Sequence, residues 1–255
     1  MNMKKEEVGH NFLARLGKTR LRPGGRRATE WLIGHGNFNS DSQVLEVACN
    51  MATTAIGLAK QYGCQITAVD LDEQALSKAE ANIQRHGLQD NIHLQRANAT
   101  KLPFDDNCFD VVINEAMLTM LPLEAKRKAV SEYFRVLKPG GVLLTHDVML
   151  TRDDDPEIIQ ALRHAINITV TPLSQANWQN LFLECGFSRC ESIYDRMTLL
   201  SPIGMIYDEG VAGTFNIVRN ALKPQNFPTF KKMFKLFNDP QQRLNFIAVC
   251  SYKAE

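Results

Sequence analysis

The sequence predicts an α/β fold with a seven-stranded, mostly parallel sheet and helices on both faces. Short apolar segments alternate with amphipathic helical segments along the chain, which is the order of parallel β–α units. The 255 residues are 44% hydrophobic and 22% charged, enough for one folded core and unlike a disordered chain. We expect a single domain over 1–255, divided into an N-terminal cap (1–40), a core (41–150) and a C-terminal part (151–255).

The predicted strands are short runs rich in Val, Ile, Leu and Phe that end in polar or turn residues. They comprise residues 44–48, 65–69, 92–95, 109–113, 142–145, 187–197 and 244–252. A stretch of about 45 residues separates the last two. We interpret its part from about 199 to 242 as an insertion with helices at 216–222 and 229–237, over the face that carries the site.

Helix ends are predicted from residues that satisfy free backbone groups. Thr53 or Thr54 is expected to cap the helix after the first strand, and Asp72 the helix after the second. Gly87 is expected to end that second helix with a positive φ. Ser174 is expected to cap a helix that carries Trp178. In the N-terminal cap, apolar residues on either side of residues 20–25 predict two short helices.

The formal net charge is only +1, so the overall charge by itself excludes few classes of binding partner. Nucleic acid is not an expected partner, since no separate basic domain is present. The N-terminus is nonetheless basic, which fits either a patch for an anionic ligand or a solvated helix and loop. The residues concerned are Lys4, Lys5, Arg15, Lys18, Arg20, Arg22, Arg26 and Arg27.

Six cysteines occur without a C-x-x-C pair, so we expect no metal site and reduced thiols. Residues 1–7 are charged and do not resemble a secretory signal. No apolar run approaches the roughly 20 residues that span a bilayer. These features predict a cytoplasmic protein.

The loop after the first strand is the main candidate for ligand binding, since ligands of open α/β sheets lie beyond the carboxyl ends of the strands. Its sequence runs from Glu46 through Ala48, Asn50 and Ala52 to Thr53. Asp70 ends the second strand. Its carboxylate suits a ribose diol, and the alternative is a helix cap, a role that Asp72 fills better.

These residues belong to four segments that together resemble the class I S-adenosylmethionine-dependent methyltransferases, a Rossmann-like family. Glu46 matches the acidic residue of the family's glycine-rich loop, although Ala48, Asn50 and Ala52 stand where the family has glycine. Asp70 matches the second segment. The third and fourth are Ala97–Phe104, with its Leu-Pro-Phe, and Arg135–Leu143, with its Lys-Pro-Gly-Gly. The branch that includes ubiquinone and menaquinone methyltransferases is the most similar.

The resemblance implies S-adenosylmethionine as the cofactor and assigns roles to single residues. Asp70 would bind the ribose, Leu71 would pack on adenine, and Asn98 with the backbone of Ala99 would hold the adenine edge. The loop residues Glu46, Ala48, Asn50 and Ala52 would bind the cofactor, as would Asn114. Arg22 would pair with the methionine carboxylate or an anionic substrate.

Methyl transfer requires positioning in a dry site, and a general base only where the acceptor loses a proton. Candidates at the ends of the fourth and fifth strands are Glu115, His146 and Asp147, each of which has a structural alternative as a turn, helix-start or packed side chain. Apolar residues of the insertion are expected to line an acceptor pocket or to form core. They are Met197, Leu200, Ile203, Met205, Ile206 and Tyr207.

We expect methyl transfer to a small molecule, with three alternatives. A protein that binds the cofactor with weak or lost catalysis is suggested by the glycine-poor loop. RNA or protein methylation is suggested by the basic N-terminus. A dehydrogenase is disfavoured because G-x-G-x-x-G is missing. The acceptor and the oligomeric state are not predicted.

Overall fold

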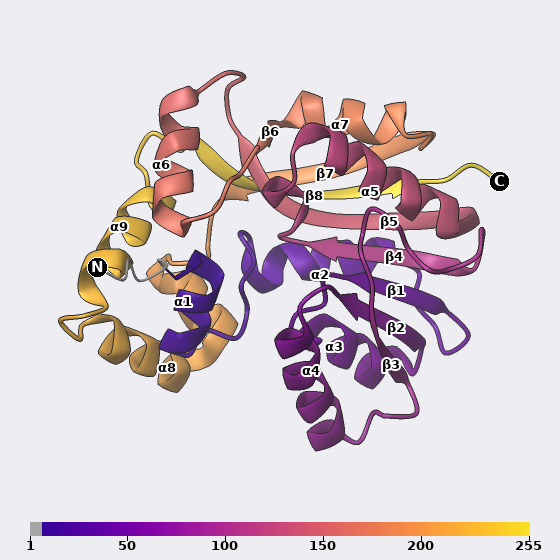
Figure 1. The fold of residues 1–255 in the computed structure, drawn as a ribbon, viewed down its shortest axis with the longest axis horizontal. Coiled ribbons are helices and arrows are strands. Elements are labelled where there is room, and N and C mark those ends of the chain that lie inside the picture. The colour runs from indigo at the N-terminus through magenta and orange to yellow at the C-terminus, as the bar shows by residue number, and fades with distance from the viewer. Residues whose placement is uncertain (1–6) are drawn as a thin grey trace, which may run out of the picture.

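The computed structural model describes residues 7–255 and contains one twisted sheet (Figure 1). Its strand order is β3-β2-β1-β4-β5-β8-β7, and β6 pairs with β5 beside this path. All pairs are parallel except β5–β8 and β7–β8. The strands are β1 (Gln43–Val47), β2 (Gln65–Asp70), β3 (Ile92–Arg96), β4 (Phe109–Glu115), β5 (Leu137–Leu150), β6 (Leu173–Ser174), β7 (Arg189–Arg196) and β8 (Leu244–Tyr252).

Helices cover both faces of the sheet and one of its ends. In Figure 1, α3 and α4 lie at the lower part of the sheet, α5 and α7 lie above it and α2 lies level with β4 and β1, while α1, α6, α8 and α9 gather at the left end. The bounds are α1 (Gly9–Leu16), α2 (Gly25–His35), α3 (Thr53–Tyr62), α4 (Glu73–His86), α5 (Leu123–Val136), α6 (Pro156–Ile166), α7 (Gln175–Glu184), α8 (Pro202–Ala221) and α9 (Phe227–Phe237), with a short 3-10 turn η1 (Leu118–Met120).

Alternation along the strands builds two cores, one on each side of the sheet. Val44 packs with α2, α3 and α4 residues such as Leu32 and Ile56, whereas its neighbour Leu45 packs with Tyr133 and Trp178 of α5 and α7. Successive side chains of a strand point to opposite faces, so a strand covered on both sides is apolar throughout. This explains why the parallel strands read as continuous apolar runs.

A third core closes the end of the molecule beyond β5 and β8. It joins α1, α6, α8 and α9 through buried residues such as Leu13, Leu162, Ile217 and Met233. The N-terminal cap and the insertion, which are far apart in sequence, therefore pack together here. This core and the carboxyl ends of the strands enclose the site described below.

The predicted fold class is confirmed, with differences in detail. All seven predicted strands are present, and the two-residue β6 is an eighth. β5 is much longer than predicted, since it begins directly after α5. Helix α6 is not among the predicted elements. α8 begins at Pro202, well before the predicted helix at 216, and is kinked at Gly210, where φ is 72° and ψ 173°.

Helix caps follow the sequence at three of the four predicted positions. Asp72 accepts from the Gln74 N–H, Ser174 accepts from the Asn177 N–H, and Gly87 ends α4 with φ 65°. The prediction for Thr53 or Thr54 is wrong, because Ala52 occupies the N-cap of α3 and no side chain caps it. Among residues 7–255, no helix combines the length and apolarity needed to cross a membrane.

Candidate functional site

The loop between β1 and α3 has a left-handed backbone at each position where the resemblance predicts glycine. The φ angles are 58° at Ala48, 49° at Asn50 and 55° at Ala52. Such angles cost a non-glycine residue roughly 1–2 kcal/mol each. The loop thus takes the tight path of a glycine-rich loop although its residues do not favour it. That path brings the backbone to the carboxyl ends of β1 and β2.

Asp70 fixes this loop to the end of β2. Its carboxylate accepts the Asn50 N–H at 2.9 Å and the Asp72 N–H at 3.0 Å. The side chain is half-buried, and each carboxylate oxygen keeps a further lone pair for a ligand. The next residue, Leu71, is 57% exposed, as expected of an apolar side chain that packs on a bound ring. Both sequence-predicted residues therefore lie at one edge of the sheet.

Asn98 and Ala99 follow β3 in a short turn next to this edge. The Asn98 amide oxygen accepts the Thr100 N–H at 3.0 Å, so the exposed side chain shapes its own turn. Asn114 lies at the carboxyl end of β4. Its amide donates to the Val47 carbonyl at 3.2 Å, but its buried Oδ1 has no hydrogen-bond partner within residues 7–255. A buried acceptor without a donor is costly in a folded protein.

The cofactor implied by the resemblance fits these residues. The left-handed loop, the Asp70 carboxylate, the exposed Leu71 and the unpaired Asn114 Oδ1 all belong to the carboxyl ends of β1, β2 and β4. The strand order reverses between β1 and β4, which is the switch point where open α/β sheets bind ligands. Donor and acceptor chemistry at this edge suits a nucleoside with an amino-acid tail.

Glu115 lies at the centre of a buried polar network beneath the loop. One carboxylate oxygen accepts the Thr29 hydroxyl at 2.6 Å, and the other accepts the Thr54 hydroxyl at 2.7 Å. Arg22 approaches it at 3.1 Å and also donates to Thr53. Burial alone would raise the pKa of Glu115, but Arg22, His146 and Thr29 hold that pKa well below its usual range. Glu115 is therefore an ionised anchor.

His146 joins the same network to the N-terminal cap. The Gly24 N–H donates to Nε2 at 2.8 Å, so Nε2 is an acceptor and Nδ1 carries the proton. Nδ1 lies 3.2 Å from Glu115 and donates to it. The imidazole is fully buried and both its nitrogens are occupied. His146 therefore stabilises the loop between α1 and α2 through its hydrogen bond with Gly24.

Glu46 behaves differently from Glu115, although both carboxyls are buried beside each other. It accepts the Ala55 N–H at 3.1 Å. Burial and the neighbouring charge of Glu115 raise the pKa of Glu46 to about 8, with Arg22 opposing them. Glu46 is thus protonated at neutral pH, a state that the sequence does not reveal.

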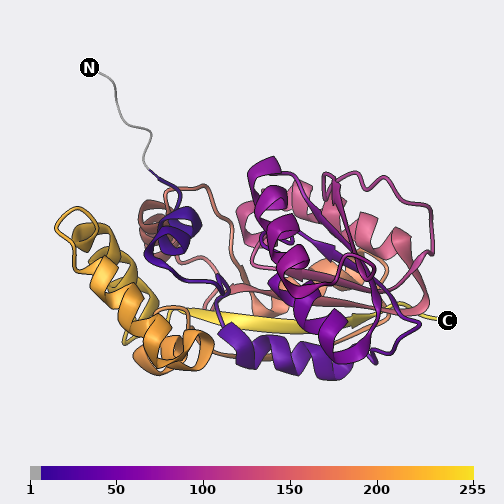
Figure 2. The same cartoon turned by 90° about the horizontal axis from the view of Figure 1, so that it is seen from below.

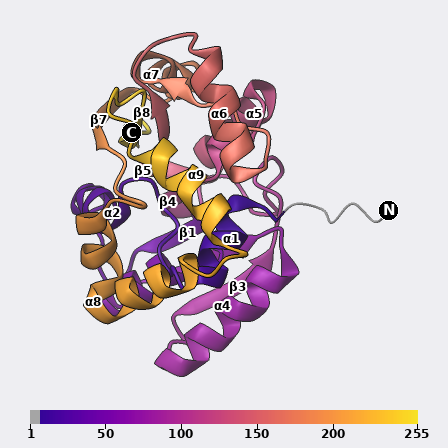
Figure 3. The same cartoon turned by 90° about the vertical axis from the view of Figure 1, so that its left-hand side faces the viewer.

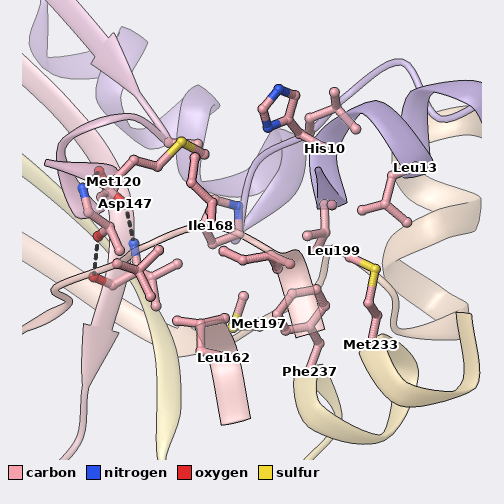
Figure 4. Close-up of a pocket in the computed structure, with 18 of the residues that line it drawn as sticks. His10, Leu13, Met120, Asp147, Leu162, Ile168, Met197, Leu199, Met233 and Phe237 are labelled. Carbon is pink, nitrogen blue, oxygen red and sulfur yellow. Dashed lines mark hydrogen bonds between the residues drawn. The ribbon is translucent and has the colours of Figure 1, made fainter. Parts of the chain in front are cut away.

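An apolar pocket of about 620 Å³, including the part that opens to solvent, adjoins the ends of β4 and β5 (Figure 4). Asp147 lies on one side of it and Met233 and Phe237 of α9 on the other. Among the lining residues that the structure describes, the polar side chains are His10, Thr119 and Asp147. The remaining walls come from α1, α6 and the segment before α8, including Leu13, Leu162, Ile168, Met197 and Leu199.

Asp147 is the carboxylate of this pocket. It accepts the Thr119 N–H at 3.0 Å and the Val148 N–H at 2.8 Å, and it is 1% exposed. Burial raises the pKa of Asp147 despite these hydrogen bonds. Of the three catalytic candidates from the sequence, Asp147 is the one that lines the pocket.

His10 is a residue of the site that sequence reasoning missed. It belongs to α1, lines the pocket, and lies close enough to Asp70 and Asp72 to feel their charge. Burial lowers the pKa of His10 against that attraction. A lone histidine far upstream of the sheet carries no local signal, so only the folded position of α1 reveals it.

The basic N-terminus is neutralised in the fold. Each cation there that the structure describes meets an oxygen of an acidic residue, in most cases a carboxylate; Lys4 and Lys5 lie outside the described residues. The pairs are Arg15–Glu7, Lys18–Asp208, Lys18–Glu209, Arg22–Glu115, Arg26–Glu30 and Arg27–Asp195, and Arg20 donates to the Asp208 carbonyl. Arg22 thus lies beside the cofactor loop, where the sequence predicts it, but bonded to Glu115.

The residues of the insertion that were predicted to line a pocket or form core fall into three groups: pocket-lining, buried in the core, and exposed. Met197 lines the pocket, and Leu200 and Met205 are buried in the third core. The prediction is wrong for Ile203, Ile206 and Tyr207, whose side chains are 83%, 48% and 52% exposed. Ile203 and Ile206 face outward, and Tyr207 lies at the surface against Arg26 and Glu30 of α2.

Comparisons with known proteins agree with this geometry. Residues 44–141 match the family model described as methyltransferase domain. Over these residues the chain is similar to the class I S-adenosylmethionine-dependent methyltransferases. The matched residues contain the loop, Asp70 and the Lys-Pro-Gly-Gly turn.

Particular relatives extend the match. An uncharacterized protein of Haemophilus influenzae is 66% identical over 251 residues, which cover 98% of this chain and 100% of that protein. A demethylmenaquinone methyltransferase of Lactiplantibacillus plantarum is 32% identical over 52% of this chain and 55% of its own length, so that alignment spans about half of each.

The fold also resembles solved structures. A geranyl diphosphate C-methyltransferase from Streptomyces coelicolor, in complex with geranyl diphosphate and S-adenosyl-L-homocysteine, has a TM-score of 0.68. The superposition covers 90% of this chain and 80% of that one, at 13% identity. At this identity the likeness concerns the fold.

Proposed function

We propose that this protein transfers a methyl group from S-adenosylmethionine to an apolar small molecule with one hydrogen-bonding group, held in the pocket of Figure 4. The observation that carries the proposal is the lining of that pocket. It is apolar apart from His10, Thr119 and Asp147 among the residues described, and it borders the ends of β4 and β5. Apolar walls with few polar groups are typical of small-molecule sites.

In this proposal, the cofactor lies along the ends of β1, β2 and β4. Asp70 holds the ribose, Leu71 covers the adenine, and Asn98 with Ala99 holds its edge. Glu46, Ala48, Asn50, Ala52 and Asn114 surround the methionine part. Arg22 acts indirectly: because its guanidinium is bonded to Glu115 and Thr53, it supports the loop.

The bound cofactor supplies an electrophilic methyl group on sulfur. The chain's own task is to hold the acceptor atom in line with it and away from water. Asp147 faces the pocket with a carboxylate that burial makes more basic than usual. We assign to Asp147 the acceptance of a hydrogen bond from the acceptor, and of its proton where one is lost. Glu115 and His146 serve as supports in this scheme, because they do not line the pocket and their polar atoms are bonded to the loop and the N-terminal cap.

Names of similar proteins support an acceptor rich in hydrocarbon, since they include demethylmenaquinone and geranyl diphosphate methyltransferases. The paired cations of the N-terminus favour a small molecule over RNA. We further propose that the whole chain acts as one methyltransferase domain. A cytoplasmic location is supported by six cysteines that are all unpaired.

The test is the release of S-adenosylhomocysteine with acceptors that share one hydroxyl but differ in hydrocarbon size. We expect kcat/KM to rise with apolar size. Asp147→Asn should lower kcat by at least about tenfold while the Kd for S-adenosylmethionine stays unchanged. Turnover that is indifferent to apolar size would refute the pocket assignment. Cofactor binding without turnover of any hydroxylated apolar acceptor would favour a protein that has lost catalysis.

A further inference from the structure

Exposed apolar side chains concentrate on α8 and the start of α9. Of eleven large hydrophobic residues that are exposed within residues 7–255, seven lie between Ile203 and Phe227. They are Ile203, Ile206, Tyr207, Val211, Phe215, Leu222 and Phe227. Scattered exposed apolar residues are normal, but a concentrated patch marks an interaction surface. Figure 3 shows α8 and α9 at the end of the molecule that faces the viewer.

The part of α8 beyond the Gly210 kink presents this patch as a stripe. Val211, Phe215 and Leu222 are spaced to lie on one side of a helix, and they are 74%, 66% and 61% exposed. Ile217, on the opposite side, is fully buried in the third core. This part of α8 is therefore apolar on both its buried and its exposed side, and the exposed residues of the stripe are not part of the third core.

Charge is segregated in the same segment. Residues 210–238 contain no Asp or Glu, although the whole chain has a net charge of only +1. No cation of this segment pairs with a carboxylate within residues 7–255, in contrast to the paired cations of the N-terminal cap. These exposed cations are Arg219, Lys223, Lys231, Lys232 and Lys235.

Helix α9, which follows α8 in the chain, carries three of these cations. Phe227, Lys231 and Lys235 are four residues apart and share its outer side, whereas Met233 and Phe237 on the inner side line the acceptor pocket. Near the start of α8, the Tyr207 hydroxyl donates to the Glu30 carboxylate at 2.9 Å. The region without acidic residues therefore does not extend to that end of the helix. We call Val211, Phe215, Leu222 and Phe227, with the five cations, the α8–α9 surface.

We propose that the α8–α9 surface docks on an anionic lipid bilayer, with its apolar side chains in the headgroup region and its cations on lipid phosphates. An apolar helix face bordered by Lys and Arg is what interfacial helices use. A second copy of this chain fits less well, since a symmetric contact would place the same unpaired cations against each other. Docking here would turn α9, which forms part of the pocket wall, toward the membrane.

Vesicle flotation tests this inference without any methyl acceptor, so its outcome is independent of the proposed function. The probes are phosphatidylcholine vesicles with and without phosphatidylglycerol. We expect binding to the anionic vesicles only, weakened by salt. Lys231→Gln with Lys235→Gln should lower the partition coefficient by about fivefold for each charge. Phe215→Ser should lower it by about fivefold or more.

Matched controls come from exposed residues elsewhere. Leu183→Ser on α7 removes another exposed apolar side chain, and Lys60→Gln with Lys78→Gln removes two exposed charges; both should leave partitioning unchanged. Equal binding of α8–α9 and control variants would overturn the proposal, as would absence of binding to anionic vesicles at low salt. Self-association in sedimentation velocity that Phe215→Ser abolishes, without vesicle binding, would assign the surface to a second copy instead.

Discussion

The two neighbouring buried carboxyls should respond oppositely to the same substitution. Glu115→Gln removes the charge that Arg22 faces at 3.1 Å, whereas Glu46→Gln replaces a carboxyl that is already neutral at pH 7. At pH 7 we expect the first variant to be much less stable than the wild type and the second to be at least as stable as the wild type. The pair is its own control, because both changes have the same size and both sites are buried.

The magnitude for Glu115 follows from what the substitution leaves behind. Removing one partner of a buried ion pair costs roughly 3–5 kcal/mol, since the other charge stays buried and unpaired. An amide oxygen still accepts from Thr29 or Thr54, so we expect the lower end, about 3 kcal/mol. At Glu46 the amide oxygen can still accept the Ala55 N–H, so we expect a loss of less than about 1 kcal/mol near pH 4.5. At pH 7 the variant should be at least as stable as the wild type, because it avoids the cost of protonating Glu46 on folding.

Urea unfolding at several pH values measures both effects. The pKa of Glu46 is raised from 4.5 to about 8 in the folded state, so its stabilisation is lost as pH rises through that window. Glu46→Gln should therefore flatten the fall in stability toward pH 8. The pKa of Glu115 is lowered by folding, so its contribution is present above the unfolded pKa and lost as the solution becomes strongly acidic.

The result that refutes this reasoning is simple to state. If the two variants lose the same free energy of unfolding at pH 7, the ionisation states assigned to the two carboxyls are wrong. A larger loss for Glu46→Gln than for Glu115→Gln would reverse them. A double-mutant cycle with Arg22→Met should give a coupling energy for Glu115 and none for Glu46.

Two further predictions concern the cofactor and the N-terminal cap. Asp70→Ala should weaken S-adenosylmethionine binding by at least tenfold, about 1.4 kcal/mol by titration calorimetry, while the exposed Asp90→Ala should not; equal affinities would remove Asp70 from the ribose. Gly25→Ala should cost more than about 2 kcal/mol in urea unfolding, because φ is +56° and a Cβ would lie 2.5 Å from the Asp208 carboxylate. Gly34→Ala, with open space around it, should cost nothing, and a similar loss at both glycines would contradict this explanation.

The fold was predictable from sequence because its signals are local. Central strands such as β4 and β8 are buried on both faces, and Asp72, Ser174 and Gly87 mark helix ends by their own side chain or flexibility. β6 has only two residues, too few for a pattern. The beginning of α8 at Pro202 was not predicted from the sequence. Gly210 interrupts the helical periodicity, and apolar residues on the exposed side of the helix hide the usual contrast between its buried and exposed sides.

The site was predictable in its place but not in its bonding. Glu46, Asp70, Asn114 and Glu115 all lie at the carboxyl ends of strands, which the order of elements dictates. Their ionisation and partners depend on groups brought in from elsewhere. Thr54 illustrates this point: its hydroxyl suits a helix cap, but in the fold it donates to Glu115.

The contact between Lys18 and the Asp208–Glu209 pair has a consequence for engineering acceptor specificity. Lys18 is 1% exposed and lies 3.3 Å from Asp208, whose carboxylate also accepts the Arg26 N–H at the start of α2. The insertion thus supplies a structural element of the N-terminal cap (Figure 2). Chimeras that exchange the insertion alone would carry away the partner of a buried lysine. Residues 7–36 and 199–242 form one exchangeable module, and they have to be transplanted together.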